Sequence, residues 1–221
     1  MNNWIDFIYY MMFSSYEYLS IFLVIMNVFN FKLRYYWKEI IGGALITTVF
    51  SYVLTIYELY NAIPLPLVII PVMIVIFTLL MKRKIIYSTV VITGSFIFYG
   101  LIQFAVFSIC LYFGGVTSTD INNPFSYKTY ILQTICATIS IVIAFYIKLV
   151  NSGFGFSLEN VRKSYSILFG VLGLLVISCS IYTMLYLALT SFVIFLITLI
   201  FLIMTFVFFY LSFKQDQKEF N

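Results

Sequence analysis

The sequence contains no histidine, and only 9% of its 221 residues are charged. Without an imidazole, the chain has no histidine general base, no histidine metal ligand and no Ser-His or Cys-His catalytic pair. An average soluble domain carries about 25% charged residues. Because 63% of the residues here are hydrophobic, a soluble fold would leave a large apolar surface in water. The composition therefore excludes a soluble globular domain, and we expect no enzymatic activity, catalytic residue, cofactor or metal site.

Cysteine is also scarce, and its placement argues against a disulfide framework. Cys110, Cys136 and Cys179 each lie inside an apolar run rather than in a polar loop, so we interpret them as small hydrophobic residues. The net charge of +4 comes from basic residues spread over short connections. Such a distribution is typical of a chain oriented in a lipid bilayer, and nucleic acid is not an expected partner.

Long apolar runs predict an all-α, polytopic membrane helix bundle with about seven transmembrane helices. The expected spans cover residues 5–29, 38–57, 63–81, 85–113, 129–148, 165–188 and 191–213. The last two are separated near Ser191, because residues 165–213 carry no charge and one helix of that length would exceed the bilayer about twofold. Residues 1–213 are thus expected to form a single seven-span domain, followed by a short cytoplasmic tail at 214–221.

The basic residues predict the orientation of these spans. With seven spans, 11 of the 12 basic residues fall on one side, and only Lys128 falls on the other. The 11 are Lys32, Arg34, Lys38, Lys82, Arg83, Lys84, Lys148, Arg162, Lys163, Lys214 and Lys218. Lysine and arginine are retained on the cytoplasmic side, so we expect a multi-pass protein of the cell membrane with its N-terminus outside and its C-terminus inside.

Aromatic residues gather at the predicted outer ends of the spans. They are Trp4, Tyr9, Tyr10, Tyr57, Tyr60, Tyr112, Phe125, Tyr127 and Tyr130. Such residues form an interfacial belt at headgroup level, and they also dominate recognition surfaces for apolar or peptidic ligands. The polar segment 114–128 is the longest expected outer loop and could contact a ligand. Both interpretations of the aromatic residues remain open from the sequence.

Glu17 is the only carboxylate well inside a predicted span, where a charge costs about 2.5–3.5 kcal/mol. It belongs to a polar stripe on one side of the first span. The stripe consists of Asp6, Tyr10, Ser14, Glu17, Ser20 and Asn27. We expect the stripe to face the bundle interior or a wet cavity opening outward. Glu17 is either a protonated, hydrogen-bonded structural group or a functional one, which senses protons or contacts a ligand together with Ser14 and Tyr10.

Small and polar residues mark further helix-packing faces. They are Thr89, Thr93, Gly100 and Gln103 in the fourth span, Gln133, Ala137, Ser140 and Ala144 in the fifth, and Gly170, Gly173 and Ser180 in the sixth. Gln103 and Gln133 are additional ligand-binding candidates that could join Glu17 in a polar core. In the last span, Ser191, Thr198, Thr205 and Ser212 recur every seven residues, which predicts a contact seam within the bundle, with a second copy or with a partner membrane protein.

Residues 14–52 read SSYEYLSIFLVIMNVFNF followed by KLRYYWKEIIGGALITTVFSY. This segment resembles the membrane sensor region of Gram-positive histidine kinases, in particular the accessory-gene-regulator-like peptide quorum sensors. The resemblance implies a sensing or ligand-binding role. The cytoplasmic kinase of such proteins is missing here, because the chain has no histidine to phosphorylate and no nucleotide-binding box. Kinase activity is therefore not carried over.

Three functions are compatible with these features. The first is a kinase-less sensory or receptor-like membrane protein of a Gram-positive bacterium that binds an extracellular or membrane-borne ligand, either a peptide or a small molecule. The second is a small substrate-binding or accessory subunit of a membrane transporter, which the polar stripe would serve. The third is a bacteriocin-immunity-type membrane protein, which needs no small ligand.

The predicted orientation can be tested with topology reporters fused after Asn61, Lys84, Asn123, Gly155 and Asn221. We expect these to read outside, inside, outside, inside and inside, because each basic connection should stay in the cytoplasm. A reporter after Lys84 that reads outside would overturn the model, since residues 82–84 are its densest orienting charge.

Overall fold

The computed structural model describes residues 3–29, 31–57, 65–113, 115–117, 120 and 123–149. Within these ranges the chain is helical and contains no strand, which confirms the all-α expectation for this part of the protein. The helices are α1 (Asn3–Val28), α2 (Leu33–Ile56), α3 (Leu65–Met81), α4 (Ile85–Tyr112) and α6 (Tyr127–Leu149). The expected spans at 165–188 and 191–213, and the tail at 214–221, lie outside the described residues.

Four of these helices are long and apolar enough to cross a membrane. The spanning segments are Trp4–Val28, Leu33–Ile56, Ile85–Cys110 and Tyr127–Leu149. The apolar part of α3, Val68–Met81, is shorter. The predicted third span at 63–81 is therefore a helix of 17 residues, whose length of about 25 Å at 1.5 Å per residue is below the 30 Å hydrocarbon thickness. The apolar helices are consistent with contact with a lipid bilayer.

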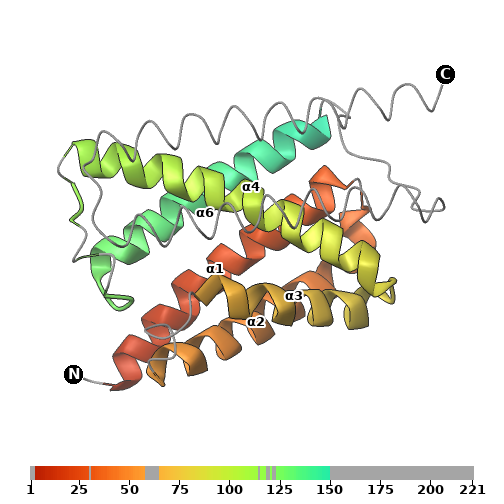
Figure 1. Cartoon of the computed structure of the whole chain (residues 1–221), viewed down its shortest axis with the longest axis horizontal. Coiled ribbons are helices and arrows are strands. Elements are labelled where there is room, and N and C mark those ends of the chain that lie inside the picture. Colours follow the sequence, from red (N-terminus) through yellow and green to blue (C-terminus); the bar gives the residue numbers. More distant parts are fainter. Residues whose placement is uncertain are drawn as a thin grey trace.

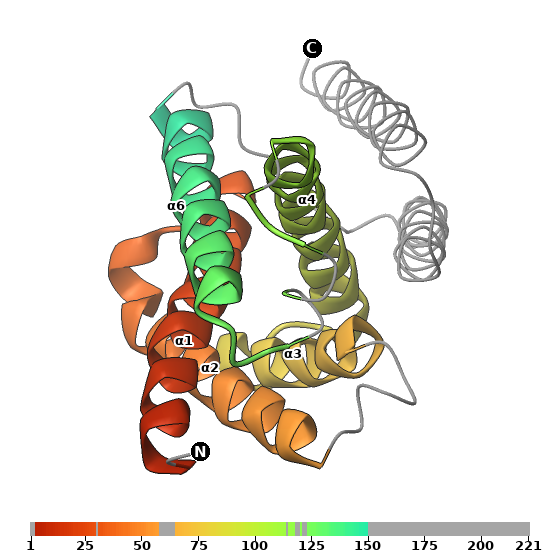
Figure 2. The ribbon, with the colours of Figure 1, turned by 90° about the vertical axis from the view of Figure 1, so that its left-hand side faces the viewer.

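The helices form a bundle in which α1 contacts α2, α4 and α6, while α3 packs between α2 and α4 (Figure 1). The view down the bundle shows α4 and α6 on one side of α1, and α2 and α3 on the other (Figure 2). The N-terminus and the α4–α6 connection lie at one end of the bundle. The α1–α2 connection, the α3–α4 turn and the end of α6 lie at the other end, so α1 and α6 run parallel.

The buried residues of α1 include both a polar set and an apolar set. Of the predicted polar stripe, the structure buries Tyr10, Ser14, Ser20 and Asn27. Toward the second half of α1, Ile21, Val24 and Ile25 enter the apolar core with Met73 and Phe77 of α3 and Ile92 of α4. The prediction that the stripe faces the bundle interior is confirmed at these four polar positions.

The packing faces of α4 and α6 differ in how well the sequence predicts them. On α6, Ala137, Ser140 and Ala144 are fully buried, as the small-residue spacing predicts. On α4, Ser88, Thr93, Ser95 and Tyr99 are buried on more than one side of the helix, whereas Gln103 is exposed. Of the predicted face, Thr93 is buried but Gln103 is not, because α4 is apolar on nearly every side and its spacing does not single out one face.

Hydroxyl groups in the spans are satisfied mostly by their own helix. The side chains of Thr47, Thr48 and Thr55 donate to the carbonyl four residues earlier at 2.8, 2.8 and 2.9 Å, and Ser140 donates to Cys136 at 2.8 Å. Such bonds satisfy a hydroxyl without a partner on another helix. They allow α2 and α6 to carry polar residues at little cost in an apolar environment.

The close approach of α2 to α1 depends on Gly43. A Cβ atom at Gly43 would lie 3.0 Å from Cζ of Phe22 and 3.4 Å from Cδ1 of Leu80, whereas one at Gly42 would meet nothing within 4 Å. Of these two glycines, Gly43 is therefore the one at which the packing requires the absence of a side chain.

We expect Gly43→Val to destabilise the bundle by about 1–3 kcal/mol, because the added methyl groups push into Phe22 and Leu80. Gly42→Val is the matched control and should leave stability unchanged or improve it, since glycine is a poor helix former. Thermal unfolding of both variants in detergent micelles measures the difference. Equal unfolding temperatures would contradict the proposed close approach.

Candidate functional site

The candidate site lies where α1 meets α4 and α6 near the middle of the bundle. Glu17 of α1 is half-buried, and its Oε1 atom accepts a hydrogen bond of 2.9 Å from the hydroxyl of Tyr99 on α4. Only 1% of the Tyr99 side chain is exposed. In the described part of the chain, the only ion pair joins Lys128 to Asp120, so no cation neutralises Glu17 there. The carboxyl is thus bonded to a neutral phenol in a predominantly apolar setting.

The phenol of Tyr10 braces α1 against α2 on the N-terminal side of Glu17. Its oxygen lies 2.7 Å from Oγ of Ser51 and 3.2 Å from Oγ1 of Thr55. The Tyr10 ring packs against Phe125, with the ring centroids 5.9 Å apart. Ser14 lies one turn further along α1 and is 2% exposed. Tyr10 and Ser14 are therefore enclosed between helices, with Tyr10 held at both its ring and its hydroxyl.

Gln133 of α6 lies at the same level of the bundle as Glu17. The rings of Phe13 and Tyr130 stack with centroids 4.9 Å apart, which fixes the register of the parallel helices α1 and α6. One helical turn further along each helix brings Glu17 and Gln133 to one level. The Oε1 atom of Gln133 is buried and has no hydrogen-bond partner. The amide oxygen of Gln133 is thus available at the level of the Glu17 carboxyl.

The five sequence candidates are consequently not equivalent. The structure buries Tyr10 and Ser14 and half-buries Glu17 and Gln133, whereas Gln103 is exposed. The expectation that Gln103 could join a polar core with Glu17 does not hold in this arrangement. Sequence reasoning missed Tyr99, whose phenol in the middle of an apolar helix is itself a signal, since buried tyrosine hydroxyls usually find a partner.

The aromatic residues that the sequence predicts at the outer ends of the spans separate into two groups. Trp4, Tyr57 and Tyr127 are 80%, 73% and 68% exposed, as residues of an interfacial belt would be. Tyr10 and Tyr130 are buried and pack between helices. The burial of Tyr10 agrees with its place in the polar stripe of α1, whereas Tyr130, for which the sequence suggested only a surface role, is a correction. Tyr60 lies outside the described residues.

Asp120 ties down the connection before α6. Its Oδ2 atom accepts bonds from the Lys128 ammonium at 2.8 Å and from the hydroxyl of Thr117 at 2.7 Å. The bonds from Lys128 and Thr117 lower the pKa of Asp120 to about 2. The carboxyl is therefore ionised at neutral pH, and the single basic residue of this end, Lys128, is already paired.

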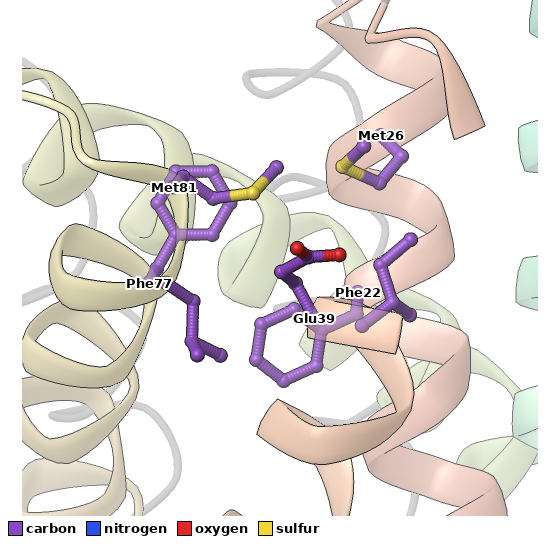
Figure 3. A pocket seen from close by; sticks show the side chains of 7 residues that line it. Phe22, Met26, Glu39, Phe77 and Met81 are labelled. Carbon is purple, nitrogen blue, oxygen red and sulfur yellow. The ribbon is translucent and has the colours of Figure 1, made fainter. Parts of the chain in front are cut away.

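A small cavity lies away from Glu17, between α1, α2 and α3 near the opposite end of the bundle. The cavity volume in which the centre of a water molecule fits is about 10 Å³, so the cavity has room for one water at most. Figure 3 shows the Glu39 carboxylate directed into the space between Met26 and Met81, with Phe22 and Phe77 beside it. This cavity is too small for an organic ligand.

Metal-ligating side chains do not gather anywhere in the described ranges, where no three residues of the histidine, cysteine, aspartate and glutamate types come together. Cys136 is fully buried in α6, and its thiol is free. Glu17 is therefore a single carboxyl hydrogen-bonded to a phenol, an arrangement suited to hydrogen bonding with a further donor group.

Comparisons with protein families, with curated proteins and with solved structures find no match to this chain. The functional argument therefore depends on the residues of the site themselves.

The bond between Tyr99 and Glu17 can be tested by Tyr99→Phe, which keeps the ring and removes the hydroxyl. We expect a loss of about 0.6–1.7 kcal/mol, the range found for side-chain hydrogen bonds between membrane helices. Tyr87→Phe removes a hydroxyl from the beginning of the same helix and is the control. Unfolding in mixed micelles with increasing dodecyl sulfate measures both, and equal stability of the two variants would show that the Tyr99 bond adds nothing.

Proposed function

We propose that this protein is a receptor-like, sensory integral membrane protein that binds an extracellular or membrane-borne ligand and has no catalytic activity of its own. The observation that carries the proposal is the Glu17 carboxyl, half-buried at the centre of the bundle and hydrogen-bonded to Tyr99. Ionisable groups inside membrane helices are costly, and they usually mark a ligand, ion or proton site.

The proposed orientation is seven spans with the N-terminus outside and the C-terminus inside the cell membrane. It is supported by the distribution of basic residues between the two ends of the bundle. One end holds the α1–α2 connection, the α3–α4 turn and the end of α6. That end carries Lys32, Arg34, Lys38, Lys82, Arg83, Lys84 and Lys148. The opposite end carries Lys128 alone among the described basic residues, and Lys128 is paired with Asp120. This asymmetry is what the positive-inside rule requires.

The chemistry of the site favours a ligand that donates hydrogen bonds. The Glu17 carboxylate and the Gln133 amide oxygen are acceptors, and no described cation competes for them. A primary ammonium group or the N–H of a peptide would pair with both. The bracing of Tyr10 by Ser51 and Thr55 keeps the helix that carries Glu17 in place during such binding.

A sensory role is also supported by the resemblance of residues 14–52 to sensor regions of Gram-positive histidine kinases, since Glu17 lies within that segment. A sensor without a kinase needs another protein for its output. The proposed contact with that protein, or with a second copy of the chain, is the seam of Ser191, Thr198, Thr205 and Ser212, which lies outside the described residues.

A transporter subunit is the second candidate. It is favoured by a set of other buried polar atoms that have no hydrogen-bond partner. They are both side-chain polar atoms of Asn27, Oγ1 of Thr93 and Oγ of Ser95. Asn27 continues the polar stripe of α1 toward the opposite end of the bundle. A passage for a polar substrate would use such groups in succession, whereas a receptor needs only the outer ones.

The role of Glu17 can be tested with a long-chain primary amine and the alcohol of the same chain length, added to the protein in zwitterionic vesicles. We expect the amine to raise the unfolding temperature of the wild type more than the alcohol does, because only the ammonium pairs with the carboxylate. Glu17→Gln should fold normally and lose this difference.

Glu17→Leu separates ligand binding from a purely structural role. Leucine leaves the Tyr99 hydroxyl without its partner, so this variant should be less stable than Glu17→Gln. Equal effects of amine and alcohol on the wild type, or a preference for the amine that survives in Glu17→Gln, would contradict the proposed site.

A further inference from the structure

Six basic side chains lie together at the end of the bundle away from the N-terminus. We call them the basic patch: Lys32, Arg34, Lys38, Lys82, Arg83 and Lys84. All six are exposed. They come from two connections that Figure 1 shows at the same end, the α1–α2 connection with the start of α2 and the α3–α4 turn. A positive-inside bias explains why basic residues occur at this end, but not why they converge.

The ring of Phe31 holds the two connections together. Its centroid lies 6.1 Å from the rings of both Phe77 on α3 and Tyr87 on α4, and 6.4 Å from Tyr36 on α2. The guanidinium carbon of Arg83 lies 5.9 Å from the same ring centroid, within the range of a cation–π contact. The α3–α4 turn is therefore packed against the start of α2, directly beside Lys32.

Two helices also begin at this patch. Helix α2 begins at Leu33 and α4 at Ile85, and neither has an acidic residue in its first turn. Lys32 occupies the N-cap of α2 without capping it through its side chain. The N-terminus of a helix carries a partial positive charge, so both helix ends add to the field of the six cations. The local positive potential is uncompensated by any residue in these first turns.

The one acidic residue within 31–40 and 81–90 does not neutralise the patch. It is Glu39, whose Oε2 atom is buried without a hydrogen-bond partner in the cavity of Figure 3. In the described part of the chain, the ion pair between Asp120 and Lys128 lies at the opposite end. The patch thus presents six cations and two helix N-termini to an anion supplied from outside the chain.

The surface next to the patch is apolar and suits an acyl chain. Trp37, Ile41 and Leu45 follow one another at four-residue intervals along α2 and are 55%, 43% and 46% exposed. Tyr35 is 71% exposed at the same helix start. Tryptophan and tyrosine prefer the headgroup level of a bilayer, so the patch lies where lipid phosphates are found. A free phosphate would use the cations but not this apolar strip.

We propose that the basic patch binds the headgroup of an anionic phospholipid, with its phosphate between the start of α2 and the α3–α4 turn and an acyl chain along Trp37, Ile41 and Leu45. Clusters of basic residues at the ends of membrane helices recognise anionic lipids in this way. The binding is independent of the ligand proposed for Glu17, because the two sites lie on different helix contacts and at different levels of the bundle.

The chain provides its own reporters for this proposal, since it contains only two tryptophans, Trp4 and Trp37, at opposite ends of the bundle. In Trp4→Phe, the fluorescence comes from Trp37 beside the patch. The full-length variant is placed in phosphatidylcholine vesicles. These contain about 20 mol% of either brominated phosphatidylglycerol or brominated phosphatidylcholine, enough to titrate one site. Bromine quenches tryptophan only at short range.

We expect brominated phosphatidylglycerol to quench Trp37 at least about threefold more strongly than brominated phosphatidylcholine, a preference that falls with salt as screening requires. The matched control, Trp37→Phe, leaves Trp4 at the other end and should show no such preference. Arg83→Gln with Lys38→Gln in the Trp4→Phe background should abolish the preference, and the four remaining cations of the patch keep the orienting charge.

Three results would overturn the proposal. Equal quenching of Trp37 by both lipids would show that the patch has no preference for an anionic headgroup. A preference that survives in the double variant would assign it to other residues. The third result is that inorganic phosphate at about 10 mM, far above a micromolar Kd, removes the preference, whereas chloride at the same ionic strength does not. This result would identify a free-phosphate site instead.

Discussion

The requirement that polar groups be satisfied without water shapes the contacts that join α1 to α2 and α4. In hydrocarbon, an unpaired polar group costs several kcal/mol, so helices that carry hydroxyls, amides and a carboxyl need partners within the protein. The threonines of α2 satisfy themselves through their own backbone. Tyr10 joins α1 to α2, and Tyr99 joins α4 to α1 through Glu17. The helices are thus connected by a few long-range hydrogen bonds set in an otherwise apolar core.

The sequence predicts the positions of these helices better than their contacts. Apolar runs place the first five helices close to their observed bounds, because the length and composition of a membrane helix follow from the bilayer itself. The exception is the start of α2, which begins at Leu33 and not at the predicted residue 38, because the helix continues through its basic residues. The inward face of α1 is also predictable, since its polar residues fall on one side. The partner of Glu17 is not: α4 is apolar all round, so nothing in its spacing distinguishes the side of Tyr99 from that of Gln103.

The same difficulty applies wherever a feature depends on two elements at once. Glu39 follows basic residues in the sequence, yet its Oε2 atom is buried toward Met26 and Met81. Tyr130 resembles an interfacial residue in the sequence, but it stacks on Phe13 in the bundle. In both cases the rotation of one helix against another decides the outcome, and a periodic pattern within a single helix carries no information about that rotation.

The separation of Glu17 from Tyr99 has a consequence for the synthesis of the protein. Their hydrogen bond links residues 82 positions apart. At 5–20 residues per second, α1 therefore enters the membrane about 4–16 s before the Tyr99 hydroxyl emerges. Helix α6, which packs alongside α1 and encloses the same region, follows later still. During this interval the nascent chain depends on the insertion machinery, or on water drawn into the bilayer, to accommodate a carboxyl that the finished bundle shelters by itself.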